Sequence, residues 1–359
     1  MSSILTITII CKDEISVMER LLNNLNKLND IQVVILDTGS TDGTVEVIKE
    51  FSKYSPNIKL AEYTWNDSFA DARNAVLALV DTEYSMWLDC DDIIYDDTIE
   101  FLNNIHSYIY QNKADLYRMY YKLGPNSGMY RERIFKTDKF KWVGDIHEVL
   151  DQINGDNYTE DTISEKYFIH HSKIKVNEPG RNLRIFEQMI AKGKPFNERE
   201  KVYYAKELYY NGLPEAYDKL KDCVYNGNSW FGDKLACCEI LYKLEKDQDK
   251  KIDICMKAIT LGPSPRPDFL CYIGDYFYLV KKNLSQAEAW YRYAYESNYL
   301  EQSTQEIITD NKYYTWYPLI QLSVVCWYTD REKANEYYRI SKELYPDNIY
   351  VKMNSKYFN

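Results

Sequence analysis

The sequence lacks three patterns that would each assign it to a common class of protein. Its eight cysteines form no Cys-x-x-Cys pair, which argues against a cysteine-based zinc site and for buried thiols in a reducing compartment. Its longest apolar runs, residues 4–11 and 72–80, are too short to cross a membrane. No basic and apolar leader precedes residue 4, so we expect no signal peptide and a cytoplasmic protein.

The sequence also lacks an excess of positive charge. Its net charge is -11, which argues against a chain built to coat nucleic acid or an anionic membrane. Hydrophobic residues make up 45% of the chain and aromatic residues 15%, with 35 tyrosines, which is typical of a folded protein. A length of 359 residues allows two domains, each with its own core.

The first half of the chain alternates short β-rich runs with helical patterns. This order predicts an α/β fold with a mostly parallel, Rossmann-like sheet, and such sheets bind ligands beyond the carboxyl ends of their strands. We expect strands at residues 4–11, 31–38, 58–63 and 84–88, and helices at residues 16–28, 44–54 and 70–80.

The pattern of the second half predicts an all-α domain. Paired helical patterns with turns between them resemble the tetratricopeptide repeat, although insertions, among them residues 299–314, interrupt the period. The alternative is a plain helical bundle. The pairs lie at residues 203–220, 235–263, 270–294 and 321–346, and we expect an α/β domain at 1–175, a helical linker at 176–199 and the repeats at 200–359.

Three polar clusters follow three of the predicted strands, at residues 11–14, 37–43 and 89–92. All three should therefore line one edge of the sheet. The second cluster, "DTGSTDG", either lets a ligand approach the backbone and a helix N-terminus or simply turns the chain and caps the next helix.

The third cluster places Asp89, Asp91 and Asp92 directly after the apolar run "YSMWL". Carboxylates this close repel one another unless a cation lies between them. Mg²⁺ or Mn²⁺ held by one or two carboxylates leaves positions for phosphate oxygens. The alternative is a solvated acidic loop that caps a helix.

Two further stretches carry histidines beside possible ligands or bases. "FKWVGDIHEVL" contains His147, which could complete a ligand set, and Glu148, which could act as a base. "FIHHS" supplies His170 and His171, one of which could face the same site.

Taken in order, "TITIICKDE", "VVILDTGSTDGT", "FADARNAVL", "MWLDCDD", "RERIFK" and "WVGDIHE" resemble the successive motifs of family 2 glycosyltransferases. The resemblance covers nearly all of residues 4–175, and the helical tail resembles the branch that glycosylates glycocin peptides. It implies a GT-A fold, a nucleotide-sugar donor, most simply a UDP-sugar, and Mn²⁺ or Mg²⁺.

The resemblance also implies roles for single residues. For the donor, Asp37 would meet the uracil or ribose, with Ser40 in the same loop, Lys12 and Glu14 would flank the base, and Arg73 would lie near the diphosphate. For the metal, Asp91 would be the direct ligand, with Asp89, which also reaches toward the ribose, and with His147 and His171. For the catalytic base, Glu148 would be the first choice, with Asp145 and Asp92 as competitors.

These roles together describe a metal-dependent inverting glycosyltransferase. The acceptor would be a peptide, a protein or a glycan, and the Tyr-rich helical faces could also pair two chains into a homodimer. One alternative is an inactive catalytic fold that serves as a docking scaffold through its repeats. A nucleotidyltransferase is a second alternative, but "CKDE" lacks the glycine-rich basic loop that such an enzyme would show.

Overall fold

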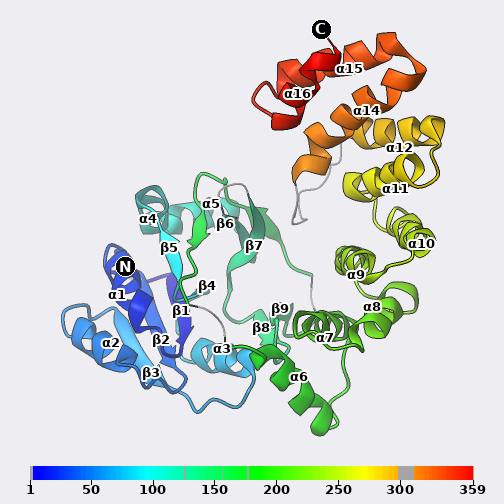
Figure 1. Cartoon of the computed structure of the whole chain (residues 1–359). Coiled ribbons are helices and arrows are strands. Elements are labelled where there is room, and N and C mark those ends of the chain that lie inside the picture. The colour runs from blue at the N-terminus through cyan, green and yellow to red at the C-terminus, as the bar shows by residue number, and fades with distance from the viewer. Residues whose placement is uncertain (1–2, 125–126, 156, 176–177, 298–310, 359) are drawn as a thin grey trace. The chain divides into compact units, whose positions relative to one another are not determined.

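The computed structural model describes residues 3–124, 127–155, 157–175, 178–297 and 311–358. The chain forms two compact units, Met1–Lys194 and Pro195–Asn359 (Figure 1). Within the described ranges, no helix is long and apolar enough to cross a membrane.

The first unit is built on a mixed sheet whose first four strands are parallel. The sheet order is β3-β2-β1-β4-β7-β6-β11-β5, and β10 also pairs with β6. Strands β7 and β5 run antiparallel to their neighbours. The strands are β1 (Leu5–Cys11), β2 (Gln32–Asp37), β3 (Ile58–Glu62), β4 (Tyr84–Leu88), β5 (Asp92–Ile94), β6 (Leu116–Gly124), β7 (Ser127–Lys136), β10 (Glu160–Thr162) and β11 (Ile169–His171).

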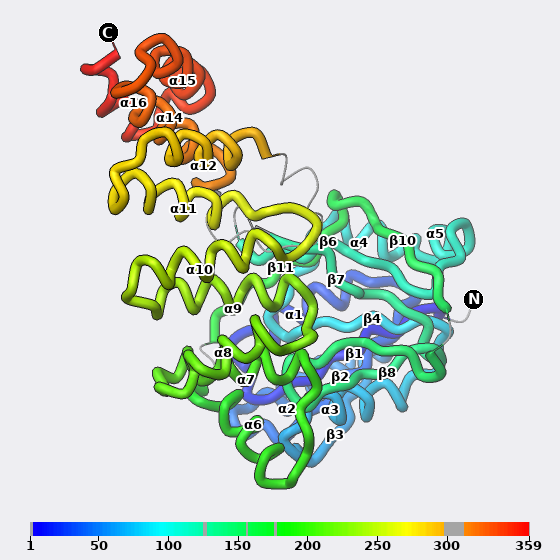
Figure 2. Tube along the Cα trace, turned by 90° about the vertical axis from the view of Figure 1, so that its right-hand side faces the viewer, coloured from blue at the N-terminus to red at the C-terminus, as the bar shows by residue number. Residues whose placement is uncertain are grey.

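The predicted α/β order is confirmed, and the helices cover both faces of this sheet (Figures 1 and 2). On one face α1 packs five buried side chains at helical spacing against β1 and β4. On the other face Val76 of α3 packs on Val34 and Leu36. The helices of this unit are α1 (Ile15–Leu25), α2 (Thr44–Ser52), α3 (Phe69–Leu77), α4 (Asp96–Asn103), α5 (Ile105–Asn112) and α6 (Arg181–Ala191).

The parallel register brings the strand ends to one edge, as predicted. Cys11 lies opposite Asp37, and Ile9 lies opposite Leu88. At the far side of the sheet, β11 places His171 opposite Asp92. A separate hairpin of β8 (Phe140–Val143) and β9 (Val149–Gln152) carries residues 144–148 in its turn.

The second unit is a run of helices in which each helix packs on the next along the chain. Close approach is specified by small residues: a Cβ on Gly274 of α11 would lie 2.6 Å from the ring of Tyr291 on α12. Most of the insertion at residues 299–314 lies outside the described residues. The helices are α7 (Glu198–Tyr210), α8 (Ala216–Tyr225), α9 (Phe231–Leu244), α10 (Gln248–Ala258), α11 (Pro267–Leu279), α12 (Leu284–Glu296), α14 (Trp316–Thr329), α15 (Arg331–Leu344) and α16 (Ile349–Asn354).

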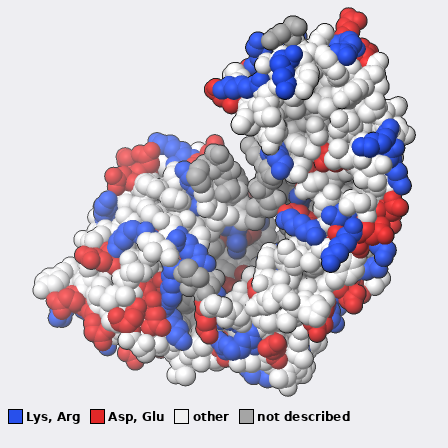
Figure 3. All heavy atoms as spheres, in the orientation of Figure 1, with Lys and Arg blue, Asp and Glu red and all other residues white. Residues whose placement is uncertain are grey.

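The surface agrees with the acidic composition. On the face shown in Figure 3, Asp and Glu side chains predominate over α1 and α2 of the first unit. Lys and Arg side chains are scattered over that face and form no continuous basic area.

Asp115 ties the start of β6 to the segment before β10, and we expect Asp115→Asn to destabilise the protein. Its side chain is 9% exposed and contacts Lys136 and Lys139. Burial acts to raise the pKa of Asp115, but hydrogen bonds from Lys139 and Thr159 outweigh it and lower the pKa to about 2. Because the folded pKa lies below the unfolded value, this stabilisation is present above about pH 4 and is lost as the pH falls toward 2.

Urea unfolding at pH 7 should therefore show a loss of about 2 kcal/mol in Asp115→Asn. Asp138→Asn, at an exposed position between β7 and β8, is the control and should leave the free energy of unfolding unchanged. Equal stability of the two variants would contradict the role given to Asp115.

Candidate active site

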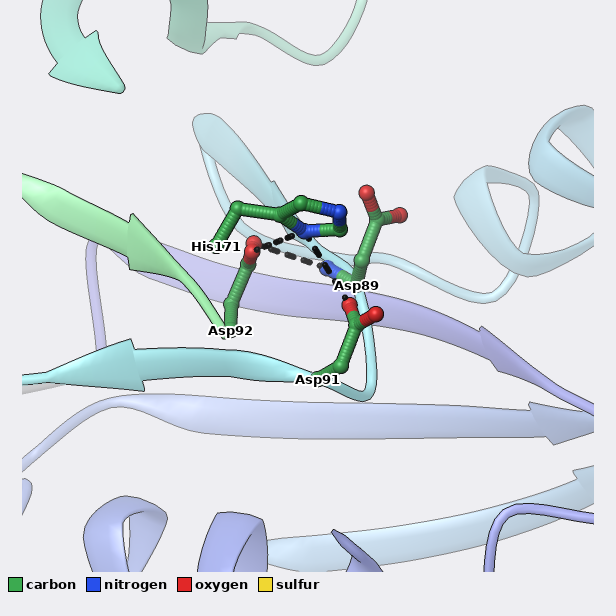
Figure 4. Close-up of side chains that lie close together, drawn as sticks. All are labelled: Asp89, Asp91, Asp92 and His171. Carbon is green, nitrogen blue, oxygen red and sulfur yellow. Dashed lines mark hydrogen bonds and ion pairs between the residues drawn. The ribbon is translucent and has the colours of Figure 1, made fainter. Parts of the chain in front are cut away.

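An acidic group lies where β4 ends and β5 begins. One ligand atom from each of Asp89, Asp91, Asp92 and His171 lies within 4.8 Å of the others (Figure 4). Asp89 and Asp91 come from the turn after β4, Asp92 is the first residue of β5, and His171 comes from β11, which pairs with β5. The fold thus brings together Asp89, Asp91 and His171, three of the four predicted metal ligands, from positions far apart in the sequence.

Asp92 is the buried member of this group. Its side chain is 0% exposed, and Arg133 Nη1 lies 3.2 Å from its Oδ2. The Asp89 amide donates to Oδ2, and the Tyr121 hydroxyl donates to Oδ1 at 2.8 Å. A base has to reach the acceptor, so this burial argues against Asp92 as the catalytic base.

Arg133 was not predicted as a site residue, although it lies in the motif "RERIFK". Its guanidinium is fully buried between the rings of Trp87 and Tyr121, at 3.6 Å and 4.1 Å from their centroids. Among the described residues, its Nε and Nη2 have no hydrogen-bond partner. In the sequence Arg133 is one of several charged residues of that motif, and nothing there distinguishes a buried arginine from an exposed one.

His171 contacts two of the carboxylates. Its Nδ1 lies 3.3 Å from Asp91 and 3.5 Å from Asp92. Hydrogen bonds with Asp91 and Asp92 raise the pKa of His171 to about 10, which reflects the negative charge gathered around its ring. His147 does not belong to this group within the described part of the chain. It lies in the turn between β8 and β9, with a backbone φ of 54°.

Arg73 joins two of the predicted site residues. Its Nη2 lies 2.9 Å from Asp89, its Nε lies 2.6 Å from Glu148, and the guanidinium packs between Trp87 and Trp142. Burial raises the pKa of Asp89, but the charges of Arg73 and Arg133 outweigh it, so the net pKa lies below its usual value. Asp89, a predicted metal ligand, and Glu148, the first choice for the catalytic base, therefore flank the same cationic side chain.

Asp145 lies in the same turn as Glu148 and is held differently. Its carboxylate lies 2.6 Å from Lys194, and its backbone carbonyl accepts from the Phe69 amide at the start of α3. Its side chain is 20% exposed, compared with 13% for Glu148. Asp145 is thus the more accessible of the two carboxylates.

The loops after β1 and β2 are tied together by hydrogen bonds. Asp37 is 5% exposed and accepts the amides of Gly39 and Ser40 at 2.9 Å and 3.0 Å. Ser40 in turn accepts the Asp13 amide, and Asp42 accepts the Ile15 amide at the start of α1. The loop "DTGSTDG" therefore turns the chain and caps a neighbouring helix, and it also fixes the position of Asp37.

Lys175 closes the other side of the β1 loop. Its Nζ donates to the carbonyls of Lys12 and Asp13 and lies 3.3 Å from Glu14. Burial raises the pKa of Glu14, and Lys175 opposes this shift. The side chain of Lys12 is exposed at this edge.

The ligand atoms in the acidic group suit a hard divalent cation. Three carboxylates and one imidazole offer mainly oxygen, which Mg²⁺ and Mn²⁺ prefer over sulfur. Cys90 lies between Asp89 and Asp91 in sequence but donates from its Sγ to the Ile10 carbonyl instead. The residues at this edge therefore fit a Mn²⁺ or Mg²⁺ ion.

Comparisons with known proteins find similarity to glycosyltransferases. Residues 6–142 match the family described as Glycosyl transferase family 2. The SPbeta prophage-derived glycosyltransferase SunS of Bacillus subtilis is 23% identical over 256 residues, which are 68% of this chain and 56% of SunS. Glycosyltransferase GlyA of Streptococcus pneumoniae is 29% identical over 34% of this chain and 17% of its own length. The chain thus spans about half of the length of SunS and less than a fifth of the length of GlyA.

Among solved structures, TarS residues 1–349 of S. aureus align over 80% of this chain and 90% of that chain, with 11% identity and a TM-score of 0.40. The mannosyltransferase PcManGT of Pyrobaculum calidifontis, solved with GDP-Man and Mn²⁺, aligns over 71% of this chain and 84% of that chain, with 18% identity and a TM-score of 0.38.

Proposed function

From the glycosyl transferase family 2 domain that this chain contains, we infer a metal-dependent inverting glycosyltransferase that takes its sugar from a nucleotide-sugar, most simply a UDP-sugar. The observation that carries the proposal is the group of Asp89, Asp91, Asp92 and His171 at the carboxyl edge of the sheet. Its acceptor is a peptide, a protein or a glycan.

The residues divide the work between the two sides of the donor. Asp89, Asp91 and His171 would hold the cation, and a cation there would supply positive charge against the negative charge of the leaving diphosphate. Asp37 and Ser40, held by their own loop, face the uracil or ribose, and Lys12 and Glu14 flank the base. Arg73 keeps Asp89 at a fixed separation from Glu148. His147 remains a further candidate ligand from the hairpin turn.

The catalytic base has to take a proton from the acceptor as it attacks the anomeric carbon. Glu148 and Asp145 both lie in the turn between β8 and β9, so either carboxylate can serve an acceptor bound at that turn. Glu148 is paired with Arg73, and Asp145 with Lys194. With one catalytic base and no general acid, the acceptor would displace the diphosphate in a single step and invert the configuration of the anomeric carbon.

We keep residues 1–175 as the catalytic domain, 176–199 as a linker and 200–359 as tetratricopeptide-like repeats, which present an extended acceptor or pair two chains. All eight cysteines are free and buried, which favours a cytoplasmic location.

Hydrolysis of the donor in the absence of acceptor tests this function. We expect the purified chain with Mn²⁺ to release nucleotide from one member of a panel of UDP- and GDP-sugars, and EDTA to stop the release. If no donor is hydrolysed and none raises the melting temperature in the presence of Mn²⁺, the inactive docking scaffold becomes the better description.

A further inference from the structure

The ring of His171 has two nitrogens in different surroundings. Nδ1 lies 2.8 Å from the Tyr121 hydroxyl and 3.3 Å from Asp91. Figure 4 shows the other ring nitrogen, Nε2, on the side of Asp89. Which nitrogen carries a proton decides which one can bind a metal.

The hydrogen bonds of Tyr121 indicate which nitrogen of His171 carries the proton. A phenol has one proton to donate, and the carboxylate of Asp92, paired with Arg133, can only accept. Tyr121 therefore donates to Asp92 at 2.8 Å, and its oxygen accepts from Nδ1–H of His171. The proton stays on Nδ1, and Nε2 is the nitrogen left to coordinate.

We propose that Tyr121 and Asp92 are positioning residues that hold His171 with Nδ1–H directed inward and Nε2 directed toward Asp89 as a metal ligand. This inference rests on the proposed function and deepens it, because it assigns the ligand atom and the residues that fix it. Metal-binding histidines usually donate their second N–H to a carboxylate or another acceptor, and losing that partner costs roughly 10- to 100-fold in metal affinity.

The placement of Tyr121 suits this role. Its side chain belongs to β6, which pairs with β11 directly before His171, and Ile169 lies opposite Tyr121 in the register. The centroid of its ring lies 4.1 Å from the Arg133 guanidinium, and its hydroxyl lies between Asp92 and His171. Tyr121→Phe keeps this ring contact and removes only the hydroxyl.

Binding of Mn²⁺ alone to the full chain, followed through the electron paramagnetic resonance signal of free Mn²⁺, tests the proposal without measuring activity. We expect Tyr121→Phe to weaken Mn²⁺ binding roughly 10- to 100-fold. Tyr84→Phe is the matched control, because it also removes a buried hydroxyl, one that donates to the Ala114 carbonyl. It should bind Mn²⁺ as the wild type does.

A double-mutant cycle with His171→Ala shows whether Tyr121 acts through His171. Adding Tyr121→Phe to His171→Ala should cause no further loss of Mn²⁺ affinity. An equal loss in both backgrounds would overturn the route through His171, and so would unchanged binding by Tyr121→Phe alone. Either result leaves the proposed glycosyl transfer standing, whereas a wild type that binds no Mn²⁺ overturns both proposals.

Discussion

Asp91→Asn should lower metal-dependent release of nucleotide from the donor by at least about 100-fold. The change removes one anionic ligand at nearly constant size, and metal stabilisation of the leaving group contributes several kcal/mol to the transition state. The fold should be unaffected, because the backbone carbonyl at position 91 still accepts from Arg20 and from the Ser172 amide, and an asparagine side-chain oxygen can still accept from His171.

The measurement is the initial rate of nucleotide release with saturating Mn²⁺, together with the melting temperature of each variant. Asp96→Asn is the matched control, because Asp96 is an exposed carboxylate at the start of α4 that pairs with Lys27. It should keep the wild-type rate. A rate in Asp91→Asn within a few-fold of wild type would exclude Asp91 as the metal ligand.

Arg133→Met should lower the free energy of unfolding by about 3–5 kcal/mol, the cost typical of breaking a buried ion pair from one side. Methionine can fill the space between Trp87 and Tyr121, but the carboxylate of Asp92 then stays buried without its cation. Arg131→Met, on the same strand, is the control: Arg131 is 31% exposed and pairs with Glu132, so its loss should cost less than about 1 kcal/mol.

Urea unfolding of both variants measures this difference. Combining Arg133→Met with Asp92→Asn should recover part of the lost stability, because the double variant no longer buries an unpaired charge. If Arg133→Met costs no more than Arg131→Met, the Asp92–Arg133 pair does not hold this edge of the sheet together.

The elements that could be predicted from sequence are those with strong local periodicity. The first four parallel strands and the three helices between them begin and end within a few residues of their predicted limits. Strands β5 and β11 have three residues each, too few for an alternation to be recognised. The long pair β6 and β7 was not predicted either, since its polar and aromatic residues alternate irregularly.

For the candidate site, the edge of the sheet was predictable and the partners across it were not. The carboxyl ends of parallel strands meet by topology, so Asp37 and Asp89 could be placed together from the sequence. The contact of Asp92 with His171 depends on antiparallel pairing between two short strands, and no local pattern encodes it. Burial of Arg133 likewise follows from tertiary packing between two aromatic rings.

The pairing of β11 with β5 also has a consequence for the order of folding. In the helical unit each helix packs on its neighbour in sequence, so contacts form over short loops and at small entropic cost. In the first unit His171 must find Asp92 at a sequence separation of 79 positions, counted as 171 minus 92. Closing so long a loop comes late, so the metal-binding geometry should be among the last native features to form. A chain interrupted before β11 would hold the three aspartates without His171.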